Sequence, residues 1–283
     1  MRRRSLGQLI LGLWLMGLQS AAGPLPPEGF LRSFDLKALP GGGFSALHMT
    51  ADGASAVILT DKGGFLRVKI DRAAGQVTSG PLLAVLDAKG RPLRDGQSDT
   101  EGLAVGPGGR AWISTEGTAR VLSMPRIGQP STRMPRPKAF AQFPPNTAFE
   151  ALARAPDGTL WLIPEAAVKG DLPVFTWTGT AWEKAYSLRH DPFWLVADAC
   201  FDDKGRLYVL ERLFAGPAGF ASRIRRFDQG TEALILQTAL GTHDNLEGLS
   251  IWRDGTGLVA SMVSDDNFLK LFRAELVEYR LPD

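Results

Sequence analysis

An internal repeat marked by turn glycines constrains the fold of this chain more than any other feature. Gly53, Gly109, Gly158, Gly205 and Gly255 lie 56, 49, 47 and 50 residues apart, and each stands between two short apolar runs. Such a pair of runs predicts a β-hairpin, because glycine tolerates the positive φ that a tight turn needs.

Further apolar runs extend the hairpins. Phe65–Ile70 follows the first hairpin, and Arg120–Ser123, Val174–Trp177 and Ile224–Phe227 follow later ones. Four-stranded units of this period are typical of β-propellers. We therefore expect an all-β propeller of four-stranded blades, with five blades favoured, six as a second count and a β-sandwich as the alternative fold. The last repeat has no room for a fourth strand, so Phe30–Leu36 is expected to complete that blade, close the ring and remove exposed sheet edges.

The N-terminus has the pattern of an export signal. Arg2–Arg4 precede an apolar run, Leu9–Leu18, and three small residues follow it. This run is too short to span a bilayer and fits a cleavable signal peptide. We expect residues 1–22 to be that signal peptide and residues 23–283 to form a single β-propeller domain without a transmembrane segment. The expected location is periplasmic or secreted, by either the general or the twin-arginine route.

The charge balance argues against a nucleic-acid partner. The chain has 32 basic and 30 acidic residues, and three of the arginines fall in the expected signal peptide. The remaining charge is close to balanced, so the broad basic footprint of nucleic-acid-binding domains is absent.

Acidic residues recur at one position of the repeat. Glu101, Glu150 and Glu247 each stand eight residues before their turn glycine, at the start of the strand expected to line the central channel. This arrangement predicts that their carboxylates converge near the axis. Converging carboxylates repel one another unless a cation, an arginine or a shared proton offsets the charge. A hard divalent cation such as Ca²⁺ is the expected partner of such oxygen ligands.

A second set of polar residues is expected to ring the same mouth of the channel. All but Asp198, which stands near the start of its first strand, end or follow the second strands. They are Asp61, Glu116, Glu165, Asp198, Glu211, Asp265, Asp266 and Asn267. Arg212 could offset the charge of an oxyanion or a phosphate. His243, four residues before Glu247, is the best candidate for a proton-transferring base. The alternative, that each acid caps a turn or pairs with a basic residue between blades, stays open.

Signatures of several other hydrolases are absent from the sequence. It contains no Gly-x-Ser-x-Gly elbow, no His-Glu-x-x-His and no pair of cysteines. A conventional serine hydrolase and a zinc site of familiar spacing are therefore not indicated.

Two stretches, Asn245–Leu249 and Ser264–Phe268, resemble the family described as esterase-like activity of phytase. Gly43–Leu47, Thr60–Gly64 and Asp99–Leu103 support the resemblance, which covers nearly all of the chain after the expected signal peptide. It implies an exported bacterial β-propeller that hydrolyses an ester or a phosphoester. The chain is also distantly similar to calcium-dependent lactonase propellers, but it lacks their full ligand spacing.

These observations together predict a metal-dependent esterase or phosphoesterase that acts as a monomer on a small-molecule ester or phosphoester. Glu101, Glu150 and Glu247 are the expected metal ligands, and His243, Glu247 and Arg212 are the expected catalytic residues. Two rival hypotheses are a non-catalytic propeller that binds a small ligand or a protein on one face, and a propeller with an ion that only stabilises the ring. The fold alone does not decide between them.

Overall fold

The computed structural model of this chain describes residues 27–283 except 95–96, 145–147, 267 and 269–271. The expected signal peptide, residues 1–22, lies outside the described residues and stays a prediction. No helix in the described part of the chain is long and apolar enough to cross a membrane.

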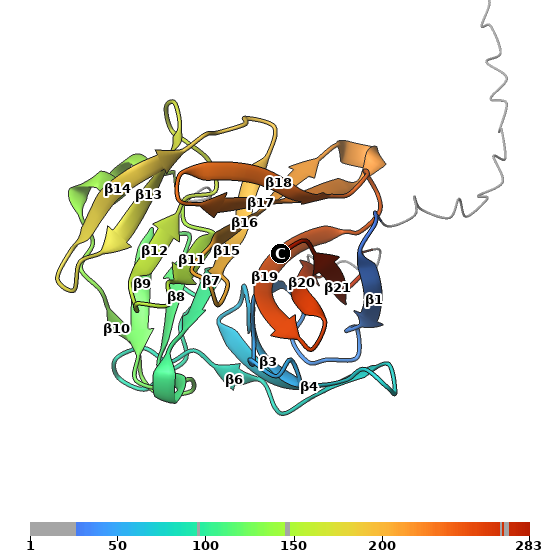
Figure 1. Ribbon diagram of the computed structural model, residues 1–283. Helices are drawn as coiled ribbons and strands as arrows, with labels where there is room; N and C mark the ends of the chain where they lie inside the picture. Colours follow the sequence, from blue (N-terminus) through green and yellow to red (C-terminus); the bar gives the residue numbers. More distant parts are fainter. Residues whose placement is uncertain (1–26, 95–96, 145–147, 267, 269–271) are drawn as a thin grey trace, which may run out of the picture.

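Five antiparallel sheets stand in a ring, and their strands are labelled in chain order (Figure 1). The first blade contains β2 (Phe44–Met49), β3 (Ser55–Thr60), β4 (Gly64–Asp71), β5 (Gln76–Ser79) and the short β6 (Leu83–Ala84). The second contains β7 (Thr100–Val105), β8 (Ala111–Thr115), β9 (Arg120–Met124) and β10 (Thr132–Arg133). The third contains β11 (Ala151–Arg154), β12 (Leu160–Ile163), β13 (Leu172–Trp177) and β14 (Trp182–Leu188). The fourth contains β15 (Leu195–Phe201), β16 (Leu207–Phe214), β17 (Phe220–Asp228) and β18 (Thr231–Gln237).

The fifth blade joins the two ends of the chain. It consists of β19 (Asn245–Asp254), β20 (Gly257–Asp265), β21 (Glu275–Leu281) and β1 (Phe30–Asp35), with β1 antiparallel to β21. The five-bladed propeller and its closure by the N-terminal strand are therefore confirmed. Three short 3₁₀ helices, η1 (Pro107–Gly109), η2 (Lys138–Gln142) and η3 (Gly216–Ala218), lie in connections between the described strands.

The first strand of each blade lies next to the axis and contacts the first strands of both neighbouring blades. Glycine makes this close approach feasible in two places. A Cβ atom on Gly102 would lie 2.6 Å from the Glu150 carbonyl oxygen, and one on Gly248 would lie 2.7 Å from the Leu47 nitrogen. The Glu-Gly-Leu repeat is thus explained: the glycine admits the neighbouring strand, and the leucine that follows enters the core, as Leu249 does at 1% exposure.

The hydrophobic cores lie between adjacent blades. Phe44 of the first blade packs in one cluster with Leu276 of the fifth, and Tyr208 of the fourth packs in another with Tyr279 of the fifth. Similar clusters fill the other three interfaces between described blades. Because burial of one large apolar side chain contributes about 1.5–3 kcal/mol, stability is distributed around the ring.

Four of the five repeat glycines take a positive φ, as the hairpin pattern predicts. The fifth hairpin differs, because β19 and β20 turn at Gly255 and Thr256, and the positive φ of 154° falls on Gly257. There, the Asp254 Oδ1 atom accepts hydrogen bonds from the backbone nitrogens of Thr256 and Gly257. The side chain of Asp254 therefore holds this turn.

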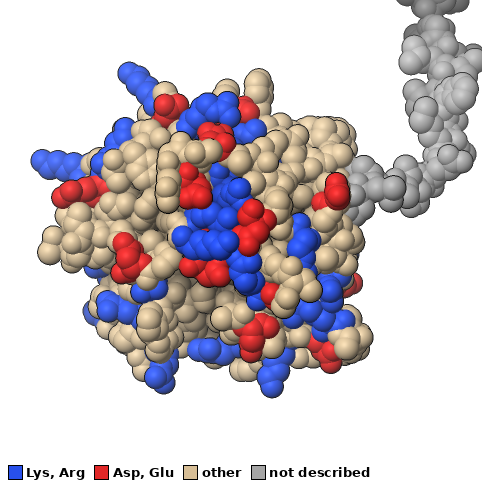
Figure 2. Space-filling model, viewed as in Figure 1, with Lys and Arg blue, Asp and Glu red and all other residues tan. Residues whose placement is uncertain are grey.

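The hairpin turns of the inner strands and the C-terminus share one face of the ring. Figure 2 shows that face, with acidic and basic side chains interspersed near its middle. The Asp283 carboxylate forms ion pairs there with Lys204, Arg206 and Arg253, with nitrogen–oxygen distances of 2.9, 2.7 and 3.1 Å. The other face carries the starts of the inner strands, roughly 30 Å away along the ten residues of β19 at about 3.3 Å per residue.

Candidate functional site

Acidic side chains meet at the face where the inner strands begin. Glu101 is the second residue of β7, Glu150 directly precedes β11, and Glu247 is the third residue of β19. All three are buried. The repeated position of these glutamates therefore brings them to the same end of the channel.

Two further glutamates reach this place from the ends of second strands. Glu116 follows β8, and its backbone nitrogen donates to the Asp99 carbonyl at 2.9 Å. Glu165 follows β12, and its backbone nitrogen donates to the Ala148 carbonyl at 3.1 Å. In each blade the end of the second strand is therefore fixed to the loop that leads into the first strand.

Four of these glutamates and Asp99 form two overlapping groups of carboxylates, which we call the acidic cluster. Oxygens of Asp99, Glu101 and Glu116 lie within 4.8 Å of one another. Oxygens of Glu116, Glu150 and Glu165 do the same, so Glu116 belongs to both groups. Asp99 was not among the predicted site residues; it directly precedes β7 and stands two residues before Glu101.

Arg212 of β16 borders the acidic cluster from the fourth blade. Its guanidinium donates to Glu165 Oε1 at 3.0 Å and to Asn245 Oδ1 at 3.1 Å, and it forms an ion pair with Glu247. Asn245 also donates to Glu247 Oε1 at 2.6 Å. Glu247 therefore holds the arginine in place, and neither of the two close carboxylate groups includes it.

The carboxyl pKa values reflect the crowding of negative charge. Burial raises the pKa of Glu101 well above its usual value, and the nearby carboxylates add to the shift while Arg212 opposes it. Burial likewise raises the pKa of Glu150 well above normal. Burial, then the charges of Asp99 and Glu165, raise the pKa of Glu116 to about 7. An added proton or a bound cation would relieve this repulsion.

His243 makes its contacts elsewhere in the fifth blade. Its Nδ1 atom lies 3.1 Å from Glu275 Oε1, and its Nε2 atom lies 2.5 Å from the Tyr279 hydroxyl. Both partners belong to β21, two strands out from the axis. These bonds engage both ring nitrogens, and a role for His243 in proton transfer stays a prediction on which nothing below depends.

Two acids predicted for the channel mouth have structural partners. Glu211 is fully buried and binds Arg223 at 2.5 Å and Arg225 at 2.5 Å. Neighbouring residues of a strand face opposite sides, so Glu211 points away from the side that Arg212 occupies. Asp198 accepts hydrogen bonds from the backbone nitrogens of Ala199 and Leu249, which connects β15 to β19.

The remaining predicted residues lie where the first and fifth blades meet. Asp61 pairs with Lys62 at 3.0 Å, and burial raises the pKa of its carboxyl. Asp266 Oδ1 accepts a hydrogen bond from the Gly43 nitrogen at 3.1 Å. Asp265 ends β20 opposite Asn245. Asn267 lies outside the described residues.

An open cleft of about 480 Å³ adjoins Arg212 on the side of the fourth blade. Apolar side chains line it, and Arg212 and Asn245 stand at its polar end; the apolar residues are Pro192, Phe193, Leu195, Phe214 and Phe220. We call this the aromatic cleft. Arg212 lines this cleft and also donates a hydrogen bond to Glu165 of the acidic cluster. A ligand in the cleft would therefore lie next to the acidic cluster.

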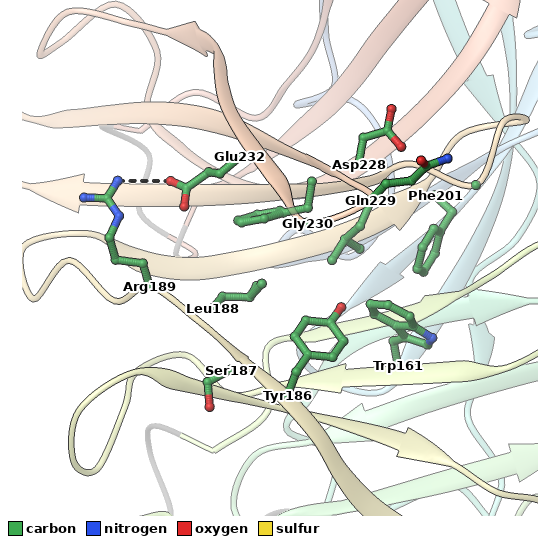
Figure 3. A pocket seen from close by; sticks show the side chains of 13 residues that line it. Trp161, Tyr186, Ser187, Leu188, Arg189, Phe201, Asp228, Gln229, Gly230 and Glu232 are labelled. Carbon is green, nitrogen blue, oxygen red and sulfur yellow. Dashed lines mark hydrogen bonds and ion pairs between the residues drawn. The ribbon is translucent and has the colours of Figure 1, made fainter.

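A second cavity, of about 560 Å³, lies between the third and fourth blades at the hairpin-turn side. The rings of Trp161, Tyr186 and Phe201 pack edge to face along it, and Arg189 pairs with Glu232 at its rim (Figure 3). None of its lining residues belongs to the acidic cluster. It is therefore separate from the candidate site.

Comparison with protein families yields one match. The family model named phytase-like, described as esterase-like activity of phytase, matches residues 40–268. This range contains the whole acidic cluster, Arg212 and the aromatic cleft. No functionally curated protein matches the chain.

Comparison with solved structures returns other propellers at low sequence identity. An α-L-arabinofuranosidase from Podospora anserina, in complex with cellotriose, has a TM-score of 0.53 and 11% identity, and the match covers 92% of this chain and 96% of that one. A luciferin-regenerating enzyme has a TM-score of 0.52 and 10% identity, with 88% and 95% covered. A gluconolactonase from Xanthomonas campestris has a TM-score of 0.47 and 17% identity, with 83% and 71% covered. At these identities the likeness to the first two structures shows the fold alone.

Proposed function

This chain belongs to the phytase-like family, and from that premise we propose that it hydrolyses a small-molecule ester or phosphoester at the acidic cluster, with a divalent cation held by the cluster's carboxylates. The observation that carries the proposal is the convergence of five carboxylates in two groups whose oxygens lie within 4.8 Å. Such a concentration of buried negative charge is costly unless a cation compensates it.

The donor set fits a hard divalent cation. Every group in the acidic cluster is a carboxylate, and Ca²⁺ prefers six to eight oxygen ligands at about 2.3–2.6 Å. Two ligands of one Ca²⁺ ion are therefore at most about 5 Å apart, which agrees with the 4.8 Å limit within each group. Zinc sites use histidine and cysteine more often, and neither residue is present in the cluster.

The residues of the acidic cluster and their neighbours can be given separate roles. Glu150 and Glu165 of one group would hold the cation, which when bound supplies charge that polarises an ester oxygen and acidifies water. Glu101, in the other group, would add its negative charge beside Glu116, which both groups share. Glu116 is half-buried and belongs to both groups, so it is placed to accept a proton from water beside the cation. Arg212 would stabilise negative charge that develops on the substrate, and Glu247 would orient Arg212.

The proposal includes the setting in which the enzyme works. The mature chain would begin at residue 23, act as a monomer and be periplasmic or secreted, in keeping with the N-terminal pattern.

A direct test uses purified protein, residues 23–283, with p-nitrophenyl esters and phosphates in the presence of Ca²⁺ or a chelator. The variants Glu101→Gln and Glu150→Gln keep the side-chain size but remove the charge. We expect each to lose most of the Ca²⁺-dependent turnover. The matched control is Glu183→Gln, on the exposed face of β14, which should keep full activity.

Three outcomes distinguish the proposal from its rivals. Turnover that needs the ion and both glutamates supports a hydrolase. An ion that raises the melting temperature without any turnover indicates a purely structural ion. The absence of turnover, together with a melting temperature that neither the ion nor the chelator changes, would instead favour a non-catalytic propeller.

A further inference from the structure

Two large aromatic side chains stand exposed beside the candidate site. Phe193 is 75% exposed and Phe214 is 62% exposed, and both line the aromatic cleft. Exposed apolar patches that border polar groups are typical of ligand-binding surfaces. Here the bordering polar groups are Arg212 and Asn245.

The fold holds one wall of this cleft firmly. Phe214 and Phe220 are the last paired residues of the β16–β17 hairpin, and their ring centroids are 4.7 Å apart. Phe220 in turn packs edge to face against Phe272, with centroids 6.2 Å apart. Phe220 is buried, so it supports the exposed Phe214 ring from below.

Another part of the cleft lining comes from the connection between the third and fourth blades. Asp191 Oδ1 accepts a hydrogen bond from the Phe193 nitrogen at 3.2 Å, and the Asp191 carbonyl accepts one from the Trp194 nitrogen at 3.0 Å. This turn directs Trp194 inward, where it is buried, and leaves Phe193 exposed. Asp191 is itself anchored by Arg223 at 3.2 Å. The exposure of Phe193 therefore follows from an ordered turn.

We infer that the aromatic cleft binds an aryl group of the substrate, so that this protein acts on aryl esters or aryl phosphoesters. The inference rests on the function proposed above and names its substrate class. A substrate with one apolar ring and one ester group matches the two parts of the cleft: the ring would pack against Phe193 and Phe214, and the ester group would reach Arg212 at the polar end. A substrate covered with phosphates or hydroxyls would leave the phenylalanines without a partner.

The expected effect follows from the apolar contact area. Removing one phenylalanine ring uncovers several tens of Å² of a bound aryl group, which at about 25 cal/mol per Å² corresponds to roughly tenfold in kcat/KM. A small alkyl ester does not reach the phenylalanine ring, so its kcat/KM should stay nearly the same.

The test compares Phe193→Ala and Phe214→Ala with the wild type on 1-naphthyl acetate and on trifluoroethyl acetate. For each ester, kcat/KM of the variant is divided by kcat/KM of the wild type, so that the intrinsic reactivity of the ester cancels. We expect about a tenfold loss of kcat/KM on the naphthyl ester and less than a twofold change on the small ester. Leu234→Ala, an exposed apolar residue of β18, is the matched control and should change neither value.

A binding measurement separates this inference from the proposed function. N-(1-naphthyl)acetamide is a neutral amide analogue of the naphthyl ester, and its binding can be measured by calorimetry without turnover. Weaker binding to both phenylalanine variants than to the wild type, with no hydrolysis of any ester, would retain the aryl cleft and reject the hydrolase. Hydrolysis of both esters that is unaffected, or equally reduced, by the two variants would reject the aryl cleft and retain the hydrolase.

Discussion

Arg212 of the fourth blade donates a hydrogen bond to Glu165 of the third blade at 3.0 Å. Both residues stand seven positions after the turn glycine of their own blade, as Glu116 does in the second blade. One position of the repeat thus supplies two acids and one base to the same site. This substitution places a cation at that position of the fourth blade, and the aromatic cleft opens beside it.

Replacing Arg212 should separate ion binding from catalysis. In Arg212→Gln the carboxylates lose a compensating positive charge, so a divalent cation should bind roughly tenfold more tightly. Turnover should nevertheless fall by about 10²-fold, because a group that stabilises developing negative charge is lost. Calorimetric titration with Ca²⁺ and kcat on one p-nitrophenyl ester would measure the two effects. Weaker ion binding in this variant would contradict the proposed arrangement.

Removal of the ion should lower thermal stability. A ligand that binds only the folded state at a concentration of about 100 times its Kd contributes about 2.7 kcal/mol. For a domain of this size that corresponds to a shift of roughly 5–10 °C in the melting temperature. Calorimetry with Ca²⁺ and with a chelator would detect the shift. The double variant Glu101→Gln, Glu150→Gln should abolish it, whereas Glu183→Gln should not; identical melting curves for the wild type under both conditions would refute ion binding.

Much of the fold was predictable because the repeat is read directly from spacing. The interval between turn glycines predicted the blade number, and the missing fourth strand of the last repeat predicted the pairing of β1 with β21. The Glu-Gly-Leu motif also has a local cause, since at Gly102 and Gly248 the backbone of a neighbouring inner strand is too close for a Cβ atom. Such features depend on the position within one repeat, so the sequence alone reveals them.

The membership of the acidic cluster was harder to predict, because it depends on which face of a strand each residue occupies. Glu211 ends an apolar run just as Glu116 does, yet it stands six positions after its turn glycine and Glu116 stands seven. That difference of one residue turns Glu211 toward Arg223 and Arg225.

Counting from the turn glycine could also have identified two residues that were missed. Asp99 and Asn245 each stand ten positions before the glycine of their repeat, two before the glutamates already chosen. Each lies close to its glutamate: Asp99 belongs to one carboxylate group with Glu101, and Asn245 donates to Glu247 Oε1 at 2.6 Å. The contacts of His243, in contrast, depend on residues of β21 that no count within its own strand would indicate.

The metal-free protein should lose stability as the pH rises through neutrality. The pKa of Glu116 is about 7 in the folded chain against 4.5 for an unperturbed glutamate, and those of Glu101 and Glu150 are raised as well. At a pH between the unfolded and the folded pKa values, the folded state binds more protons than the unfolded state. Raising the pH in this range therefore favours unfolding. In chelator, the contribution of these carboxyls to the free energy of unfolding is fully present below about pH 4.5, and it is lost as the pH rises through their folded pKa values.

Melting temperatures measured in chelator between pH 5 and 8 would check this pH dependence. Glu116→Gln should flatten the curve, and saturating Ca²⁺ should remove most of the decline because it takes the place of the protons. A metal-free protein whose melting temperature rises steadily over this range would show that the acidic cluster does not dominate its pH dependence.

The glycines of the inner strands should tolerate no side chain. A Cβ atom on Gly248 would lie 2.7 Å from the Leu47 nitrogen and 2.8 Å from the Ala46 carbonyl carbon, and backbone atoms cannot rotate away. Gly248→Ala should therefore force β19 and β2 apart and lower the free energy of unfolding by about 1–3 kcal/mol, as overpacking typically does. Denaturant titration would measure the loss. Gly80→Ala is the matched control, because no atom lies within 4 Å of its added Cβ; equal stability of the two variants would show that contact between the inner strands does not limit residue size at Gly248.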